Sequence, residues 1–426
     1  MNSPSIRVGI MSAESITIVF HGHYSVDGVS VPSGVPQVFD LSSGIGKIYI
    51  PDDPQECFFE VHGVTIGVGF HWERREDQKF RGSVSFIREG DQITLVNIVD
   101  AEEYLLSVIS SEMNANAPEE FLKAHAVISR SWLLAQTRAR ATAAHDTCLR
   151  TEDTLIRWYD HSDHEHFDVC ADDHCQRYQG ISRQTNPTVR RAVESTAGMV
   201  LMSGSELVDA RFSKCCGGVF EEFENCWEPV HHPYLVARRD SESPHDFPDL
   251  SLDAEAAAWI TSRPDAFCAS PSAEVLSQVL NGYDRETDGF YRWTVEYSRS
   301  ELAEIVRTRT GIDFGDIVDL IPIERGTSGR IVRLKVVGTL RTMTIGKELE
   351  IRRTLSRSHL YSSAFIVDRH DIGPDGIPGR FVLHGAGWGH GVGLCQIGAA
   401  VMGSRGYSYS EILSHYFPGA EIKKIY

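Results

Sequence analysis

The chain has 426 residues, a formal net charge of −18, and contents of 42% hydrophobic and 23% charged residues. This length exceeds what one hydrophobic core usually supports, so two or three substructures are expected. The negative charge argues against nucleic acids and anionic membrane surfaces as partners, because both attract basic patches.

The sequence contains no uninterrupted apolar run long enough to span a membrane. Its first residues, MNSPSIRVGIMSAESITIVF, lack the basic leader and continuous apolar block of a signal peptide. We therefore expect no membrane-spanning segment. The compartment stays open between a cytosolic protein and the mature form of an exported one.

Residues 1–96 alternate short apolar runs with turn signals, as in SITIVF, GVTIGVGF and SVSFI, and this predicts a β-rich region. A helical period begins at Asp100 and predicts helices over 101–113 and 119–141, separated by NANAP. Further along the chain we expect strands at 198–202 and 207–213, helices near 252–260, 272–280 and 300–309, a hairpin over 328–346, and a last helix at 408–417.

These patterns predict an α+β fold, in which a helical core packs with β-rich regions in mixed or antiparallel sheets. We expect an N-terminal β-rich region at 1–96 and a first part of the core, with the helices and a metal loop, at 97–240. An insertion of unknown role follows at 241–324, and a hairpin and glycine-rich part at 325–426 complete the core.

Glu112 lies on the apolar stripe of the first predicted helix, in line with Leu105, Val108 and Ile109. A buried carboxyl group favours its neutral form, because burial penalises charge. A general acid that works near neutral pH needs this property. The alternative is an exposed glutamate at a fraying helix end.

Arg130 also lies on a mostly apolar stripe, that of the second predicted helix. A half-buried arginine needs a partner. Glu112 is one candidate, in a purely structural ion pair. The other candidate is an anionic group of a ligand, which a guanidinium can hold through two hydrogen bonds.

The segment DHEHFDVCADDHCQRYQG at 163–180 places His164, His166, Cys170, His174 and Cys175 within twelve residues. Cysteine and histidine at such spacing suit tetrahedral zinc. Four protein ligands would make a closed structural site, whereas three ligands and a water would make a catalytic one. Free thiols among loop histidines are the remaining alternative.

Three further cysteines, Cys215, Cys216 and Cys226, lie in SKCCGGVFEEFENCW. A disulfide between Cys226 and one of the adjacent pair is one interpretation, and reduced structural thiols are the other. A catalytic cysteine is the weakest option, because nothing nearby marks a base for it.

The stretch HGAGWGHGVGL at 384–394 has glycine at every second residue. In an extended segment all five glycines would lie on one face, with Trp388 and His390 on the other. Glycine inside a strand marks a place where another backbone or a ligand approaches closely, and the glycines alone do not show which. Trp388 and His390 are candidates for stacking on a sugar, with packing in a core as the alternative.

Taken together, these motifs resemble the stage II sporulation protein D family, also called the amidase-enhancer family. The resemblance rests on five segments in family order, and it covers residues 98–240 and 325–426. The segments are SEMNANAPEEFLKAHAVISRSW, HEHFDVCADDHCQRY, CCGGVFEEFENCWEPVHHPYLVARRD, SGRIVRLKVVG with IRRTLSRSHLYSSAFIV, and GWGHGVGLCQIGAAVMGSRGYSYSEILSHYFPGAEI.

The resemblance implies a lytic transglycosylase of peptidoglycan, which cuts the MurNAc–GlcNAc bond of peptide-stripped glycan strands and leaves 1,6-anhydroMurNAc ends. It implies Glu112 as the catalytic residue, which acts as acid and then as base. It also implies Arg130 as a substrate-binding residue of the same cleft, and Trp388 and His390 are expected to bind the glycan as well. With this activity, we expect a glycan strand or the Glu112 helix to lie against the glycine face at 384–394.

The resemblance also implies a structural zinc ion held by His164, Cys170, His174 and Cys175. The implied partners are peptidoglycan glycan strands and a cell-wall amidase, and the implied location is the cell envelope. Two alternatives remain: a non-catalytic, glycan-binding activator of the amidase, and a hydrolase with a catalytic zinc.

The sequence departs from the resembled motifs at several positions. Asn114 stands where the family usually has proline, and His125 and Trp132 replace the usual glutamine and tyrosine. Cys395 stands where serine is usual, in front of Gln396. None of these departures removes a residue that is assigned to the chemistry.

Overall fold

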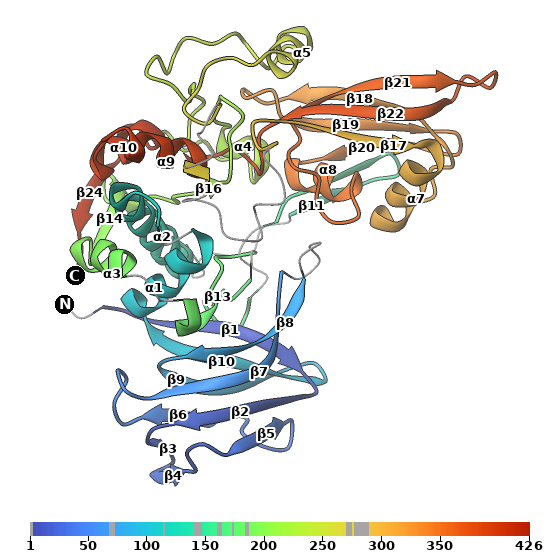
Figure 1. The fold of residues 1–426 in the computed structure, drawn as a ribbon. Helices are drawn as coiled ribbons and strands as arrows, with labels where there is room; N and C mark the ends of the chain where they lie inside the picture. The colour runs from blue at the N-terminus through green and yellow to red at the C-terminus, as the bar shows by residue number, and fades with distance from the viewer. Residues whose placement is uncertain are drawn as a thin grey trace.

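The computed structural model describes residues 3–67, 73–113, 116–139, 147–159, 164–172, 174–183, 187–269, 275–276 and 289–426. N-terminal sheets, a central layer of helices and C-terminal sheets follow one another (Figure 1). The predicted α+β class is confirmed, since helices combine with both mixed and antiparallel sheets.

Two sheets form the N-terminal region, which is blue in Figure 1, and confirm the predicted β-rich character. Phe39 of one sheet stacks on Phe86 of the other, with ring centroids 4.4 Å apart. The strand orders are β13-β1-β10-β9-β6-β3-β4 and β5-β2-β7-β8. The strands are β1 (Ser5–Ala13), β2 (Ser15–His21), β3 (Tyr24–Val26), β4 (Val29–Val31), β5 (Pro36–Asp40), β6 (Ile48–Pro51), β7 (Phe58–Ile66), β8 (Arg74–Phe80), β9 (Ser83–Glu89), β10 (Gln92–Asp100) and β13 (Val169–Cys170).

Helices α1 (Ala101–Glu112) and α2 (Glu119–Ala139) follow β10 and confirm the two helices predicted there. Helix α1 begins where it does because the side chain of Asp100 accepts a 2.9 Å hydrogen bond from the N–H of Glu102. The helices share the main core with neighbouring elements. These are α3 (Pro187–Ser195), α9 (Gln396–Ser404), α10 (Tyr409–Tyr416) and the sheet of β15 (Glu206–Leu207), β14 (Met199–Ser203) and β24 (Glu421–Lys424).

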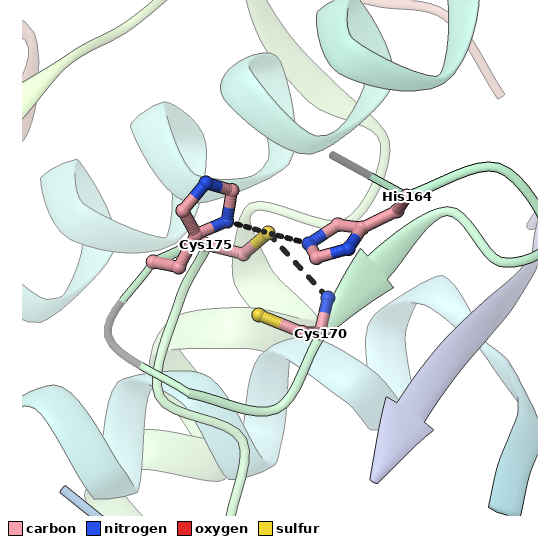
Figure 2. A group of neighbouring side chains, drawn as sticks. His164, Cys170 and Cys175 are labelled. Carbon is pink, nitrogen blue, oxygen red and sulfur yellow. Dashed lines mark hydrogen bonds between the residues drawn. The ribbon is translucent and has the colours of Figure 1, made fainter. Parts of the chain in front are cut away.

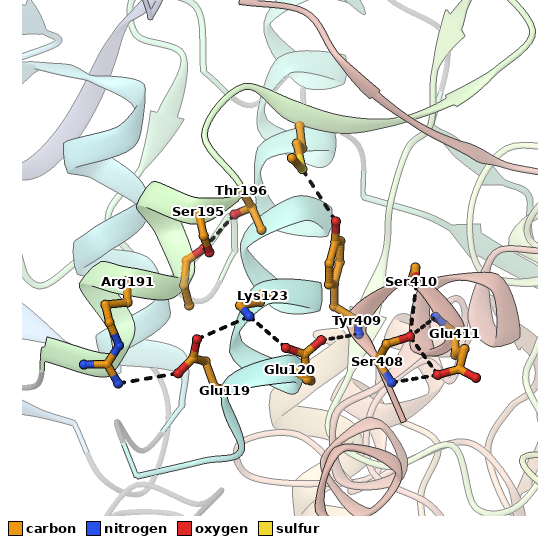
Figure 3. A network of polar contacts seen from close by, with 12 residues as sticks. Glu119, Glu120, Lys123, Arg191, Ser195, Thr196, Ser408, Tyr409, Ser410 and Glu411 are labelled. Atoms are coloured by element: carbon orange, nitrogen blue, oxygen red, sulfur yellow. Dashed lines mark hydrogen bonds and ion pairs between the residues drawn. The ribbon is translucent and has the colours of Figure 1, made fainter. Parts of the chain in front are cut away.

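The first turn of α2 is tied to α3 and α10 by charged side chains (Figure 3). Lys123 Nζ lies 3.2 Å from a carboxylate oxygen of Glu119 and 2.7 Å from one of Glu120. Glu119 also pairs with Arg191 of α3 at 3.4 Å, and Glu120 accepts a 2.8 Å hydrogen bond from the N–H of Tyr409. These contacts fix the direction of α2 relative to the C-terminal helices.

The C-terminal region has two more sheets and a core of its own. The strand orders are β11-β12-β20-β19-β18 and β17-β22-β21. Strands β17 and β18 belong to the segment predicted as an insertion, yet β17 pairs with β22 and β18 with β19, so its later half is part of these sheets. The elements are β11 (Cys148–Arg150), β12 (Thr154–Arg157), β17 (Arg292–Ser298), β18 (Ile317–Arg325), β19 (Ile331–Gly338), β20 (Thr342–Gly346), β21 (Phe365–Ile372), β22 (Pro378–Ala386), α5 (Asp253–Thr261), α7 (Arg299–Thr310) and α8 (Glu348–Thr354).

Most of the other predicted elements are confirmed. Strand 198–202 corresponds to β14, helices 252–260 and 300–309 to α5 and α7, the hairpin to β19 and β20, and the last helix to α10. The strand predicted at 207–213 is divided between β15 and β16 (Phe212–Ser213). The helix predicted at 272–280 lies largely outside the described residues. Among the helices described, none is both long and apolar enough to pass through a membrane.

Candidate functional site

The chain between β12 and α3 contains strand β13, which lies beside β1 of the N-terminal sheet (Figure 1). Its strand β13 pairs in parallel with β1, so that Cys170 lies opposite Gly9. The carboxylate of Asp168 accepts a 2.8 Å hydrogen bond from the N–H of Arg7. The middle of the loop is therefore anchored on the sheet.

The loop brings the four predicted metal ligands together. The donor atoms of His164, Cys170, His174 and Cys175 all lie within 4.8 Å of one another, and His166 lies outside this group. Cys175 Sγ is 3.4 Å from His164 Nε2 and 3.5 Å from His174 Nδ1. Figure 2 shows His164 and Cys175 directed toward one another beside Cys170. Zn–S bonds of about 2.3 Å and Zn–N bonds of about 2.1 Å separate the ligands of a tetrahedral ion by about 3.4–3.8 Å, so the observed spacings fit zinc.

The electrostatics of the loop also suit a metal ion. Hydrogen bonding to Cys175 lowers the pKa of the Cys170 thiol far below its ordinary value, and His164 and His174 add to this effect against the opposing effect of burial. The thiolate is the form of cysteine that binds metals. Four protein ligands would fill the coordination sphere of zinc, which is the arrangement of structural sites.

The chain that leaves Cys175 runs along α1 and reaches Glu112. The N–H of Arg177 donates a 3.0 Å hydrogen bond to Oε1 of Glu112. Two residues later, the N–H of Gln179 donates to the hydroxyl of Ser107 at 3.1 Å. The loop with the metal ligands therefore positions the carboxyl group at the end of α1.

Gln176 strengthens this attachment and was missed in the sequence. Its side chain is fully buried, accepts a 3.3 Å hydrogen bond from the hydroxyl of Tyr104, and donates at 3.4 Å to the carbonyl of Ser129 in α2. The available signal was its place directly after Cys175 in the motif. A residue next to a metal ligand that must order two helices needs a side chain that both donates and accepts.

Glu112 is the last residue of α1 and is 8% exposed. The predicted place on a buried face is thus observed, and an exposed glutamate at a frayed end is not what the structure contains. The last turn of α1 has no basic residue, and the carbonyl end of a helix carries partial negative charge. The carboxyl group of Glu112 therefore lies between the carbonyl end of α1 and the backbone N–H of Arg177.

Arg130 is completely buried in α2 and pairs with Glu102 of α1. Its Nε and Nη2 atoms donate to the two carboxylate oxygens of Glu102 at 2.8 and 2.6 Å, and Nη1 donates to the carbonyl of Met199 at 2.9 Å. The ion pair with Glu112 that was considered from the sequence is therefore wrong. Contact with an anionic ligand would require the Glu102 pair to open, and it stays a prediction.

Trp388 and His390 lie in the glycine-rich segment, and both are partly exposed. Trp388 stacks on Tyr361 with ring centroids 4.2 Å apart, and His390 meets Trp227 at 4.9 Å in a T-shaped arrangement. Trp388 and His390 thus take part in two separate aromatic contacts. Binding of a sugar by these residues stays a prediction.

The extended conformation predicted for 384–394 is wrong beyond Ala386, where β22 ends. From there on the glycines lie in the left-handed region, as at Gly387 with a φ of 78° and Gly391 with a φ of 78°. The predicted close approach exists, but the neighbours come from the chain itself. A Cβ at Gly387 would lie 2.8 Å from the carbonyl oxygen of Cys215, and one at Gly391 would lie 2.4 Å from Cζ of Arg330. A glycan strand or the Glu112 helix was expected at this face, and these contacts occupy it instead.

The disulfide considered for Cys226 is not formed, and Cys215, Cys216 and Cys226 are all thiols. Cys226 Sγ lies 3.8 Å from the carbonyl oxygen of His390, to which it donates. The interpretation of these cysteines as reduced structural thiols therefore describes this structure.

Comparison with known proteins gives the following matches. Residues 89–202 match the family model described as Stage II sporulation protein, and residues 221–393 match one described as Domain of unknown function (DUF8618). The chain is 25% identical over 331 residues to the Amidase enhancer of Bacillus subtilis (strain 168), in an alignment that covers 75% of this chain and 40% of that protein. It is 23% identical over 329 residues to the Stage II sporulation protein D of Bacillus amyloliquefaciens. That alignment covers 77% of this chain and 76% of the relative. An uncharacterized protein of Brachyspira hyodysenteriae is 24% identical over 344 residues. That alignment covers 81% of this chain and 72% of the relative.

Proposed function

We propose, from the premise that this chain belongs to the stage II sporulation protein D and amidase-enhancer family, that it acts on the bacterial cell wall. The proposed reaction is lytic transglycosylation of peptidoglycan strands whose peptides have been removed. The bond between MurNAc and GlcNAc breaks, and the MurNAc residue ends as a 1,6-anhydro sugar. The proposed place of action is the cell envelope.

In this proposal Glu112 is the single catalytic residue. Its carboxyl group donates a proton to the glycosidic oxygen as the bond from that oxygen to C1 of MurNAc breaks. The resulting carboxylate then takes the proton of the 6-hydroxyl of the same sugar, while the 6-oxygen bonds to C1. Most glycosidases need a second carboxylate, but here the nucleophile belongs to the substrate, so its positioning contributes much of the rate.

The observation that carries the proposal is the position of Glu112, which is buried at the end of α1 and held through Oε1 by the N–H of Arg177. This contact fixes one oxygen of the carboxyl group. Because the donor is a backbone N–H, the position of this oxygen does not depend on a flexible side chain. The arrangement supports an acid of defined direction.

The proposed zinc ion has a structural part in this function. His164, Cys170, His174 and Cys175 would hold it, and the ion would supply four bonds that close the loop. The chain's own residues position the acid, because the segment from Cys175 to Gln179 follows α1 and presents the N–H of Arg177 to Glu112.

A second candidate is a non-catalytic protein that binds glycan and stimulates an amidase. The name of the Bacillus subtilis relative favours it, and the partly exposed aromatic group around Trp388 offers a surface on which a sugar could stack. The two candidates differ at Glu112, because glycan binding alone does not need an acid there.

The test is product analysis by mass spectrometry after incubation with peptide-free glycan strands. Glu112→Gln keeps the size and hydrogen-bonding shape of the side chain, and we expect it to lower the formation of anhydro ends by about 100-fold or more. Glu103→Gln is the matched control on the same helix, since Glu103 pairs with Arg81 at 3.1 Å, and it should retain activity.

Binding of both variants to insoluble glycan is measured alongside. Cleavage by Glu112→Gln at the wild-type rate would remove Glu112 as the catalytic residue. The second candidate would be supported by three results together: the wild type does not cleave the glycan, both variants bind it as the wild type does, and the wild type stimulates an added amidase.

A further inference from the structure

A second group of ligand-type side chains lies in the interior and does not share residues with the loop at 164–175. Cys216, Asp240, Cys268 and Cys395 each place one donor atom within 4.8 Å of the others. They are 2%, 0%, 1% and 0% exposed. Four separate segments supply them: the turn after β16, the loop before α5, the turn after α5, and β23 (Leu394–Cys395).

The spacing of the donor atoms fits one bound ion. Cys216 Sγ is 3.5 Å from Cys268 Sγ and 3.6 Å from Asp240 Oδ2. Bonds of about 2.3 Å to sulfur and about 2.1 Å to oxygen place two sulfur ligands of a tetrahedral zinc ion about 3.8 Å apart, and a sulfur and an oxygen about 3.6 Å apart. A disulfide would require the two sulfurs at about 2.05 Å. The two spacings therefore fit ligands of one ion and exclude a disulfide between Cys216 and Cys268 in this structure.

Hydrogen bonds from Tyr416 and from backbone N–H groups orient the donor atoms. The hydroxyl of Tyr416 donates to Oδ1 of Asp240 at 2.9 Å, which leaves Oδ2 directed toward the sulfurs. The N–H of Gly218 donates to Cys216 Sγ at 3.4 Å, and the N–H of Cys216 donates to Cys395 Sγ at 3.3 Å. Metal ligands in proteins are oriented by outer contacts of this kind.

Zinc would bind these side chains as thiolates and a carboxylate, and its positive charge would pair with theirs. Buried charges in proteins are paired or coordinate a metal, because burial removes their hydration. His415 Nε2 lies 3.5 Å from Oδ1 of Asp240, at the oxygen that does not face Cys216. A divalent ion among the sulfurs would supply the positive charge on the other side of the carboxylate.

A hollow of about 500 Å³ lies near this group, and Phe267 and His415 are among the residues that line it. Phe267 directly precedes Cys268, and His415 contacts Asp240. None of the four donor residues lines the hollow, so the group is enclosed by the folded chain.

We propose that Cys216, Asp240, Cys268 and Cys395 bind a second zinc ion in a closed, structural site. Three sulfurs and one oxygen at tetrahedral spacing favour zinc over magnesium and calcium, which prefer oxygen ligands. The site is independent of the proposed glycan cleavage, since no step of that reaction uses it.

The ion would join the four segments and fix the start of α9. Cys395 is the N-cap residue of α9, and the next residue, Gln396, lies 3.1 Å from Nε2 of His125 in α2. The second site would thus hold α9 against α2, and α2 in turn packs on α1.

Elemental analysis of the full chain, purified under reducing conditions with zinc present and then freed of unbound metal, tests the proposal. We expect two zinc ions per wild-type chain, one in Cys395→Ser, one in Cys170→Ser, and none in the double variant. Serine is the usual residue of the resembled motif at this place, so Cys395→Ser has a suitable size. Cys226→Ser is the matched control, because Cys226 is a buried thiol outside the group, and it should keep two ions.

One zinc ion in both the wild type and Cys395→Ser would overturn the proposal. If circular dichroism shows that Cys395→Ser does not fold, alkylation of the wild type decides instead. Peptide mass spectrometry should show Cys216, Cys268 and Cys395 protected from iodoacetamide with zinc bound and modified after chelation, while Cys226 stays protected. Modification of the three thiols before chelation, or a disulfide between Cys216 and Cys268, would overturn the proposal as well.

Discussion

The two groups of metal-ligand side chains in this protein are built in opposite ways. The first takes all four donors from one loop at 164–175, and none of these residues is buried. The second takes its donors from segments spread between residues 216 and 395, and all of them are buried. A local group orders a loop, whereas a dispersed group joins parts of a core. From this contrast we expect an ion at the first group to position the segment beside Glu112, and an ion at the second group to stabilise the core.

The largest expected effect is on stability at the buried group. Cys268→Ala should lower the free energy of unfolding by about 3–5 kcal/mol, because it leaves the other buried ligands without their full set of partners. Cys226→Ala removes an equally buried thiol outside the group and should cost less than about 2 kcal/mol. Urea unfolding followed by tryptophan fluorescence, with zinc in the buffer, measures both. Equal losses of unfolding free energy in the two variants would contradict a special stabilising role for the buried group.

The next effect concerns the rate at which each site releases its ion. The loop site is reached from solvent, whereas the buried site opens only with its surrounding segments, so we expect its release to a chelator to be about 100-fold slower or more. A colorimetric chelator should record two phases in the wild type. The fast phase should be absent from Cys170→Ser and the slow phase from Cys395→Ser. A single phase in the wild type would contradict a difference between the sites.

A smaller effect is expected on glycan cleavage. Cys175→Ser weakens the loop that presents the N–H of Arg177 to Glu112, and loss of such a supporting contact typically lowers activity by about 10- to 100-fold. Cys57→Ser is the control, since Cys57 is a buried thiol of the N-terminal sheets. The rate of anhydro-product formation at saturating substrate measures the effect. Full activity in Cys175→Ser would show that the loop does not position the acid.

The smallest effect is a change in the pH dependence of stability. Burial, helped by the charge of Lys214, lowers the pKa of His125 from 6.5 to about 3. The unfolded chain binds a proton here that the folded chain does not, so this residue's contribution to stability falls as the pH drops from about 6.5 toward 3. In His125→Gln that contribution is absent. Between pH 6 and pH 5 the wild type should lose about 1 kcal/mol more than the variant in urea unfolding.

Parallel losses in the two proteins would mean that His125 is hydrated in the folded state. That result would contradict the burial of His125 beside Gln396, the residue that follows Cys395.

The features that could be predicted from the sequence are those that depend on neighbouring residues. Helix α1 follows from its apolar period and from the cap at Asp100, and the loop ligands follow from their spacing. The partner of Arg130 could not be predicted, because Glu102 lies 28 residues away and on another helix. The buried group was missed for the same reason, since Cys216 and Cys395 are 179 residues apart and meet only in the folded chain.

The prediction of an extended conformation for the glycine-rich segment was wrong for a different reason. Alternation of glycine with larger residues fits a strand, and the first residues of the stretch do form one in β22. A strand pattern cannot show that the later glycines have positive φ, because glycine adopts both conformations with similar ease. The choice between them depends on Arg330, which is fully buried and donates to the carbonyl of Gly389 at 3.2 and 3.1 Å.

The close fit around Arg330 has an evolutionary consequence. Any side chain at position 391 would collide with the guanidinium, and a smaller residue at position 330 would leave the carbonyl of Gly389 without its donor. The two positions are therefore expected to change together or not at all. In related chains, a glycine-rich ending of this type should be accompanied by an arginine in the SGR turn, and the loss of one should predict the loss of the other.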